Sequence, residues 1–347
     1  MTLNARLAAL AVVLLAGSVW AYSSSVARGE RFQRGQRLLP NLVPDEVARI
    51  EIGKGEEKTT LRKQGDSFTV VEMHDYPAKN EEVNRFIRDL LEIELAKEVG
   101  RGAGLAEELG IEPPGDDTIE VALANASGQE MVRLRLGDSF PDGPGRYVRR
   151  LDREDAPIYL TAEGTFLSTS AASFLDKEIV DHPQSEVARI EGRDFVIAAD
   201  GEDGPLVLQD VPAGKREKTI ETNKLKSILD RLSFDEVFVA DDEAVRDLGF
   251  DEMLRVDLDD GTGYVLSLAA DGDQRYLRIE GHHDLGRVEI SLETPEEELR
   301  EKADQLTRAD EIEDFNAFHG SWVYRLSSFT ADKIELSRAD LLEDESS

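Results

Sequence analysis

The sequence contains no cysteine. This absence excludes a disulfide framework, a thiolate nucleophile, a cysteine-ligated zinc site and an iron–sulfur cluster. Basic residues are also scarce: 41 Lys and Arg stand against 73 Asp and Glu, and the net charge at pH 7 is −32. A surface of that charge repels polyanions, so we expect no nucleic acid among the partners.

The chain does contain enough apolar material to fold. Hydrophobic residues make up 40% of its 347 residues, which is too large a share for a wholly disordered acidic protein. At roughly 150 residues per domain, this length favours two domains once an N-terminal targeting segment is set aside.

An uncharged segment lies near the N-terminus, at residues 7–27, and most of its residues from Leu7 to Tyr22 are apolar. About 20 such residues span a bilayer as a helix. We therefore predict a transmembrane anchor within residues 1–28 and a linker at 29–43. A cleavable signal peptide is the alternative, since residues 19–21 and 25–27 offer small side chains at cleavage positions. The segment LAGS resembles a lipoprotein box, but Ser18 stands where the lipidated cysteine is needed, which excludes lipid attachment.

The charges around this segment give conflicting signals about orientation. Four arginines lie after it between residues 28 and 37, whereas Arg6 precedes it, and the positive-inside rule alone would keep the body in the cytoplasm. A signal-like segment with so short a lead normally exports the body of the protein. We expect a single-pass protein of the inner (cytoplasmic) membrane whose body faces the periplasm or the outside.

The body contains an internal repeat. Residues 46–51 (EVARIE) recur letter for letter at residues 186–191, an offset of 140. Further landmarks occur in the same order in both halves, which indicates duplication rather than two unrelated modules with similar turns. We predict a first repeat at 44–181, a second at 182–338 and a frayed acidic tail at 339–347.

The two halves predict matching elements. Each contains apolar residues at helical spacing, namely Val83, Phe86, Ile87, Leu90 and Leu91 in the first half and Leu225, Ile228, Leu229 and Leu232 in the second. Thr222 is the expected cap of the second helix, and Gly110 and Gly249 are expected to end short helical turns. Alternating strands are expected next, at 119–123 and 254–258. The expected fold class is α+β: two tandem repeats of an antiparallel sheet with helices packed on one face.

The second half also carries a helical insertion near 294–309. Residues 294–297 (TPEE) supply an N-cap, a proline at the first helical position and a capping-box glutamate. We predict a helix that runs to about Arg308 with a thin apolar seam of Leu299, Ala303 and Leu306. A stripe this narrow is typical of a surface helix that lies on a sheet.

The sequence shows no reactive constellation. His282 and His283 are neighbours, but consecutive strand residues point to opposite faces, which disfavours a shared metal ion. The acidic run 257–261 (DLDDG) resembles part of a calcium loop, yet it lacks the closing glutamate and better fits a hairpin turn between strands. We therefore predict no catalytic residue, no metal site and no cofactor.

Four aromatic residues gather near the C-terminus: Phe315, Phe318, Trp322 and Tyr324. Such a group most often packs in a core. The other interpretation is a docking patch for a partner, and it is our only candidate site.

The repeat landmarks resemble the bacterial domain-of-unknown-function family 4340. The resemblance covers about residues 40–335 and rests on VARIEI (47–52), TLRK (60–63), SFTV (67–70), the helix at 86–91, LGIEPP (109–114), Gly137 and RYVR (146–149). It departs at Phe68, where the family commonly has tryptophan, and in the second half, which lacks the Pro-Pro after Leu248-Gly249-Phe250. Family members often carry an N-terminal anchor and sit beside gliding-motility-type or auxiliary ABC transporter components. The resemblance implies an exported, membrane-tethered accessory protein and carries over no catalytic residue.

These observations favour a non-enzymatic, membrane-anchored envelope protein. Its expected partners are envelope proteins, in particular subunits of an ABC-transporter-type complex, together with the inner membrane through the N-terminal helix. Two alternatives stay open: a secreted hydrolase or glycan-active enzyme whose carboxylates converge in space, and a small-ligand binder with its site between the repeats.

Overall fold

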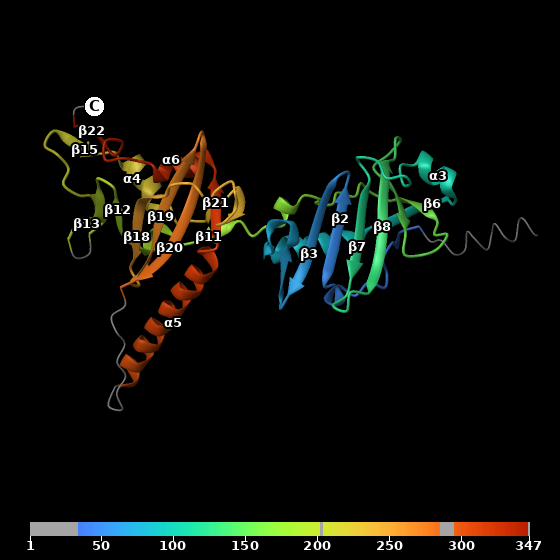
Figure 1. Ribbon diagram of the computed structural model, residues 1–347, viewed down its shortest axis with the longest axis horizontal. Helices are drawn as coiled ribbons and strands as arrows, with labels where there is room; N and C mark the ends of the chain where they lie inside the picture. The colour runs from blue at the N-terminus through green and yellow to red at the C-terminus, as the bar shows by residue number, and fades with distance from the viewer. Residues whose placement is uncertain (1–33, 202–203, 285–294, 346–347) are drawn as a thin grey trace, which may run out of the picture. The chain divides into compact units, whose positions relative to one another are not determined.

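The computed structural model describes residues 34–201, 204–284 and 295–345 (Figure 1). Within these ranges no helix combines the length and the apolar character that a membrane crossing needs. The predicted anchor at residues 1–28 lies outside them. The chain divides into two compact units between Asp176 and Lys177, five residues before the predicted repeat boundary. We call them unit 1 and unit 2 and describe each by itself.

Unit 1 is built on an antiparallel sheet of ten described strands in the order β1-β6-β10-β9-β8-β7-β2-β3-β4-β5. The strands are β1 (Gln36–Arg37), β2 (Arg49–Lys54), β3 (Glu57–Gln64), β4 (Ser67–Val70), β5 (Tyr76–Pro77), β6 (Glu94–Gly100), β7 (Ile119–Ala124), β8 (Glu130–Ser139), β9 (Arg146–Arg150) and β10 (Ile158–Thr161). Its helices are α2 (Asn80–Glu92) and α3 (Ala103–Glu108).

Unit 2 has an antiparallel sheet of eight described strands in the order β14-β13-β12-β18-β19-β20-β21-β17, with the small pairs β11-β16 and β15-β22 beside it. The strands are β11 (Glu178–Val180), β12 (Val187–Gly192), β13 (Val196–Ala199), β14 (Leu206–Leu208), β15 (Lys215–Glu217), β16 (Leu232–Ser233), β17 (Glu236–Val239), β18 (Asp251–Leu258), β19 (Thr262–Asp271), β20 (Gln274–His283), β21 (Trp322–Leu326) and β22 (Leu342–Asp344). Its helices are α4 (Thr219–Lys226), α5 (Glu296–His319) and α6 (Ser328–Ile334).

The predicted helix of unit 1 is confirmed as α2. Its apolar stripe of Val83, Phe86, Ile87 and Leu90 is buried, and the Phe86 ring meets Phe174 edge-on with centroids 5.6 Å apart. The predicted mixed architecture with mostly antiparallel sheet is likewise confirmed. In unit 2, α4 and α6 contact each other and pack against β12 and β20.

The two sheets share one strand order over eight positions. The run β4-β3-β2-β7-β8-β9-β10-β6 of unit 1 corresponds to β14-β13-β12-β18-β19-β20-β21-β17 of unit 2. The repeated VARIE segments form the matching strands β2 and β12. Ile50 of β2 pairs with Leu123 and Leu61, and Ile190 of β12 pairs with Val256 and Ile197. The same buried isoleucine therefore stands at the same place in each sheet.

Four local predictions need correction. Thr222 lies inside α4 rather than at its cap, and its hydroxyl bonds the Lys218 carbonyl. The predicted apolar stripe is not all helical, because α4 ends at Lys226, Ile228 and Leu229 lie in the following turn and Leu232 lies on β16. Gly110 ends α3 with a φ of +64° as expected, whereas Gly249 comes after a turn without helix and has no positive φ. The tail predicted to be frayed instead contains β22, which pairs with β15 and directly follows the buried Leu341.

Helix α5 is longer than predicted and lies differently. It continues past Arg308 to His319, and it contacts the sheet at β19, β20 and β21. Figure 1 shows the helix projecting beyond the sheet, with its C-terminal end held at β20 and β21. A second apolar face of the helix, made by Ile312 and Phe315, contacts the sheet. Sequence periodicity does not reveal this face because it lies inside an acidic stretch.

Truncation of the repeated isoleucine tests the packing of unit 2. Ile190 is fully buried, so Ile190→Ala is expected to lower the free energy of unfolding by about 2–5 kcal/mol and Ile190→Val by about 0.5–1.5 kcal/mol. Urea denaturation monitored by Trp322 fluorescence measures both. The neighbouring Arg189 faces solvent, so Arg189→Ala should stay within about 0.5 kcal/mol. Equal effects of Ile190→Ala and Arg189→Ala would contradict the assigned register.

Candidate functional site

The candidate site lies where the C-terminal end of α5 meets β20. The ladder between β20 and β21 ends at Leu277 and Tyr324. Farther along β20, the Gly281 N–H donates to Asn316 Oδ1 at 2.7 Å, and Asn316 Nδ2 donates to the Gly281 carbonyl at 2.8 Å. The side-chain amide of Asn316 thus pairs with both backbone groups of Gly281 as a neighbouring strand would.

The absence of a side chain at position 281 permits this close packing. A Cβ there would lie 3.1 Å and 3.3 Å from atoms of Ile312 and 3.3 Å from Phe315. Ile312 is buried, and the Phe315 ring stacks edge-on against Tyr264 of β19 with centroids 5.1 Å apart. Apolar contact and paired hydrogen bonds therefore hold the last two turns of α5 on the sheet.

The structure separates the four aromatic residues of the predicted patch by burial. Tyr324 is 0% and Trp322 9% exposed, whereas Phe318 is 37% exposed. Phe315 is half-buried under His319, with ring centroids 4.0 Å apart. Two of the four side chains thus belong to the core of unit 2, and Phe318 is the member that a partner could reach.

His319 is the buried titratable group of this junction. It is 8% exposed, and its Nδ1 lies 2.6 Å from the Tyr324 hydroxyl. Burial lowers the pKa of His319 to about 4, because the charged ring cannot be solvated there. The imidazole is therefore neutral at pH 7. With Tyr324 as the donor, its single proton sits on Nε2.

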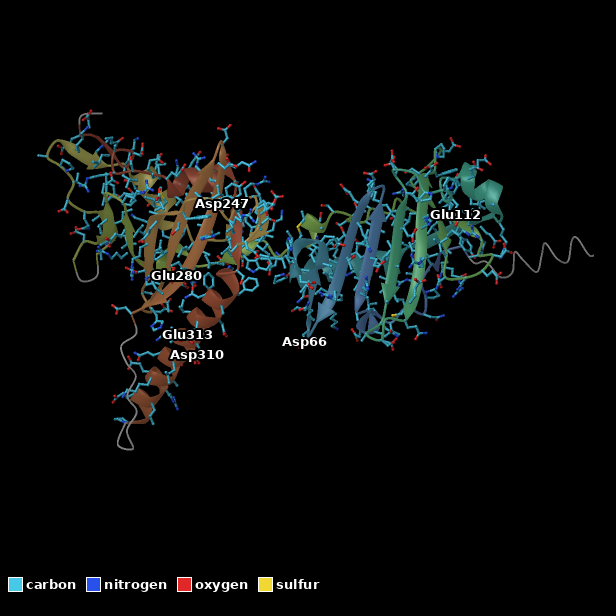
Figure 2. All side chains as sticks on the ribbon, in the orientation of Figure 1. Asp66, Glu112, Asp247, Glu280, Asp310 and Glu313 are labelled. Atoms are coloured by element: carbon cyan, nitrogen blue, oxygen red, sulfur yellow. The ribbon has the colours of Figure 1, made fainter. Side chains whose placement is uncertain are left out.

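A cleft of about 430 Å³ opens beside His319. Its wall comes from four separate segments of unit 2, and its members are Phe250, Val265, Ser267, Arg278, Ile279, Glu280, Asn316, His319, Gly320 and Trp322. The Arg278 guanidinium lies 4.3 Å from the centroid of the Phe250 ring, a cation–π contact. Figure 2 shows Glu280 on the sheet near the junction with α5. The cleft thus combines apolar walls with both signs of charge.

Unit 1 uses the corresponding arginine differently. Arg149 and Arg278 occupy the same place in the repeated Arg-Tyr-x-Arg segments, on β9 and β20. Arg149 forms an ion pair with Glu112 at 3.2 Å, whereas Arg278 lies over Phe250, which comes directly after the matching Leu-Gly turn. The arginine is therefore neutralised by a carboxylate in unit 1 and left exposed beside an aromatic ring in unit 2.

The other sequence candidates occupy ordinary structural positions. His282 bonds Asp257 at 2.7 Å, and His182 bridges Glu186 and Tyr264. No group of three metal-ligating side chains occurs within the described ranges. The run 257–261 contains the turn between β18 and β19, where Asp260 Oδ1 accepts from both the N–H and the hydroxyl of Thr262. The hairpin interpretation of this acidic run is confirmed.

Carboxylates also line cavities in unit 1. One of about 440 Å³ includes Glu51, Asp116 and Glu120. Burial alone would raise the pKa of Glu120, but hydrogen bonds and charge from Arg135 and Arg133 lower it below its ordinary value. A general acid of a glycosidase needs the opposite shift, so this carboxylate is unsuited to that role.

Sequence reasoning missed the cleft itself. The sequence marks Arg278 only as a repeat landmark, and Ser267, Glu280 and Asn316 carry no local motif. The sequence gives no usable signal here, because Glu112 has an acidic equivalent in the second half, Asp251. In the structure Asp251 pairs with Arg193 at 3.0 Å and not with Arg278.

The fold and site define a mixed α/β protein of two antiparallel sheets with a small polar cleft in its second unit. A match to the family described as Domain of unknown function (DUF4340) extends over residues 69–253, just over half of the chain. The chain belongs to this family, and the match crosses from unit 1 into unit 2. No curated protein and no solved structure matches the chain.

Removal of the Asn316 amide should loosen the junction. Asn316→Ala leaves the backbone N–H and carbonyl of Gly281 without their partners, which is expected to cost about 1–3 kcal/mol of the unfolding free energy. Urea denaturation and the exchange rate of the Gly281 amide measure the change. Asn223 on α4 is exposed, so Asn223→Ala is the matched control. If both variants lose equal stability, the proposed pairing contributes nothing.

The depressed pKa of His319 predicts a pH dependence. In the unfolded chain the ring has a pKa near 6.5, and in the folded chain it has one near 4. As the pH falls from 6.5 to 4, the unfolded state takes up the proton first, so this group lowers the unfolding free energy by about 3 kcal/mol across that window. His319→Gln retains an acceptor for Tyr324 and should flatten the stability profile between pH 6.5 and 4. Parallel profiles of the two proteins would refute the burial argument.

Proposed function

We propose that the chain is a non-enzymatic, membrane-anchored envelope protein that binds another protein, as an accessory or scaffold of an ABC-transporter-type complex. Its body consists of two copies of one α+β domain. Residues 7–22 anchor it in the inner membrane with the body on the periplasmic or outer side. The apolar N-terminal segment, the family resemblance and the shared strand order of the two sheets support this proposal.

The observation that carries the binding role is the free half of α5. Leu299 is 36% and Leu306 44% exposed, and with Ala303 they fall within about 60° of one side of the helix. Ile312, Phe315 and His319, which face the sheet, fall on roughly the opposite side. The exposed seam is therefore separate from the docked face, and it extends beyond the sheet (Figure 1).

An apolar seam on a projecting helix suits helix-to-helix or helix-to-groove recognition. Because both leucines are already more than half covered, complete burial of each stabilises a complex by less than the roughly 1.5–3 kcal/mol of a fully exposed leucine. At about 100° per residue, Arg300 and Lys302 border the seam on its two sides, and Asp310 lies in line with it farther along the helix. Both signs of charge therefore surround the seam, which favours a partner surface with an apolar centre and a mixed polar rim.

Affinity purification of the full chain from solubilised membranes tests the proposal. A transporter subunit or another envelope protein is expected to co-purify, and Leu299→Ala combined with Leu306→Ala should reduce its recovery at least tenfold. Glu301→Ala combined with Thr307→Ala, which lies off the seam, is the matched control. The proposal fails if no envelope protein exceeds background, or if the leucine variant recovers as much as wild type.

A reporter fusion at the C-terminus, with N-terminal sequencing of the mature chain, tests the membrane part separately. An exported reporter and an uncleaved N-terminus are expected. A cytoplasmic reporter contradicts the orientation, and a mature chain that begins after residue 21 or 27 contradicts the anchor.

A further inference from the structure

The cleft of unit 2 contains a cation that has no carboxylate partner in the described part of the chain. Among the described residues, the Arg278 guanidinium contacts the Phe250 ring and forms neither an ion pair nor a hydrogen bond. Two arginines on the same sheet are paired: Arg255 with Asp257 at 3.0 Å and Arg275 with Glu335 at 2.7 Å. In a chain with 73 acidic residues, an unpaired arginine held over an aromatic ring is a preformed site for an anionic group.

The expected ligand carries a second charged group besides the anionic one. Glu280 lies two positions beyond Arg278 on β20, so both side chains point to the same face of the sheet, and both are exposed. Within the described part of the chain, Glu280 forms no ion pair. A simple carboxylate would meet repulsion from Glu280, and a simple amine would meet repulsion from Arg278. A zwitterion satisfies both charges.

His319 adds a directed polar group to the cleft. It is more than nine-tenths buried, and its Nδ1 is occupied by Tyr324. Its other ring nitrogen, Nε2, makes no hydrogen bond within the described ranges, and protein atoms do not enclose it completely. Since His319 lines the cleft, Nε2–H is available to donate to a ligand there.

Part of the remaining surface of the cleft is apolar. Val265, Ile279 and Trp322 contribute to its wall. The volume of about 430 Å³ falls within the range of small-ligand sites. A ligand that satisfies the polar groups therefore also has room for an apolar side chain.

We propose that this cleft binds a free α-amino acid with an apolar side chain. The ligand carboxylate pairs with Arg278 and accepts a hydrogen bond from His319 Nε2–H. The ligand ammonium group pairs with Glu280. The apolar side chain packs against Val265, which pairs with Glu280 on the same face of the sheet, and against Trp322. This site is distinct from the seam of α5 and does not depend on the proposed protein partner.

Calorimetric titration of the detergent-solubilised full chain with L-leucine tests the site. L-leucine is expected to bind with 1:1 stoichiometry. N-acetyl-L-leucine, which lacks the ammonium charge, and L-leucinamide, which lacks the carboxylate, should each bind at least tenfold more weakly. Absence of binding by L-leucine at millimolar concentration overturns the proposal, as does equal binding of either blocked analogue. Tighter binding of the dipeptide Leu-Leu overturns the assignment to a free amino acid.

Substitutions at two exposed residues show which residue recognises each charge of the ligand. Arg278→Gln should abolish the preference for leucine over leucinamide, and Glu280→Gln should abolish the preference for leucine over its N-acetyl form. Arg189→Gln on β12 is the matched control and should bind leucine as wild type does. Urea denaturation of each variant verifies folding. If the folded Arg278→Gln and Glu280→Gln variants keep both preferences, the cleft is not the binding site.

Discussion

The pairing of one side-chain amide with one glycine determines how unit 2 presents its surface. Strand β20 extends beyond the end of its neighbour β21. A strand edge without a partner leaves backbone N–H and carbonyl groups without hydrogen bonds. Asn316 supplies the missing donor and acceptor to Gly281. Because Asn316 lies near the C-terminus of α5, the helix is attached at one end, and its other half is carried beyond the sheet.

The same attachment creates the environment of the cleft. The turn after α5 buries His319 against Tyr324 and brings Trp322 onto β21, beside the exposed side of β20. Burial keeps the imidazole neutral, so His319 supplies the cleft with a hydrogen-bond donor and not with a second positive charge. The cleft and the projecting helix are thus two consequences of one junction, although the proposed ligand and the proposed protein partner use different surfaces.

Elements with strong local periodicity were predictable from the sequence. The repeated VARIE strands, the buried stripe of α2 and the Asp260–Gly261 turn can be derived from alternation, helical spacing and turn chemistry within a few residues. Thr222 was misassigned because the hydroxyl of a threonine can bond a carbonyl one turn earlier inside a helix as well as cap one. The C-terminal half of α5 was missed because Ile312 and Phe315 stand among four acidic residues, where composition masks the apolar face.

The cleft could not be predicted because its wall is assembled from four segments that are distant in the sequence. No rule of spacing connects Phe250 with Arg278 or His319; only the strand order of the sheet does. The one-ended attachment of α5 is the central claim, and residue-resolved amide hydrogen exchange of the full chain tests it most directly. The account predicts slow exchange for residues 312–319 and at least tenfold faster exchange for residues 299–306. Uniform protection along the whole helix, or fast exchange at 312–319, would contradict it.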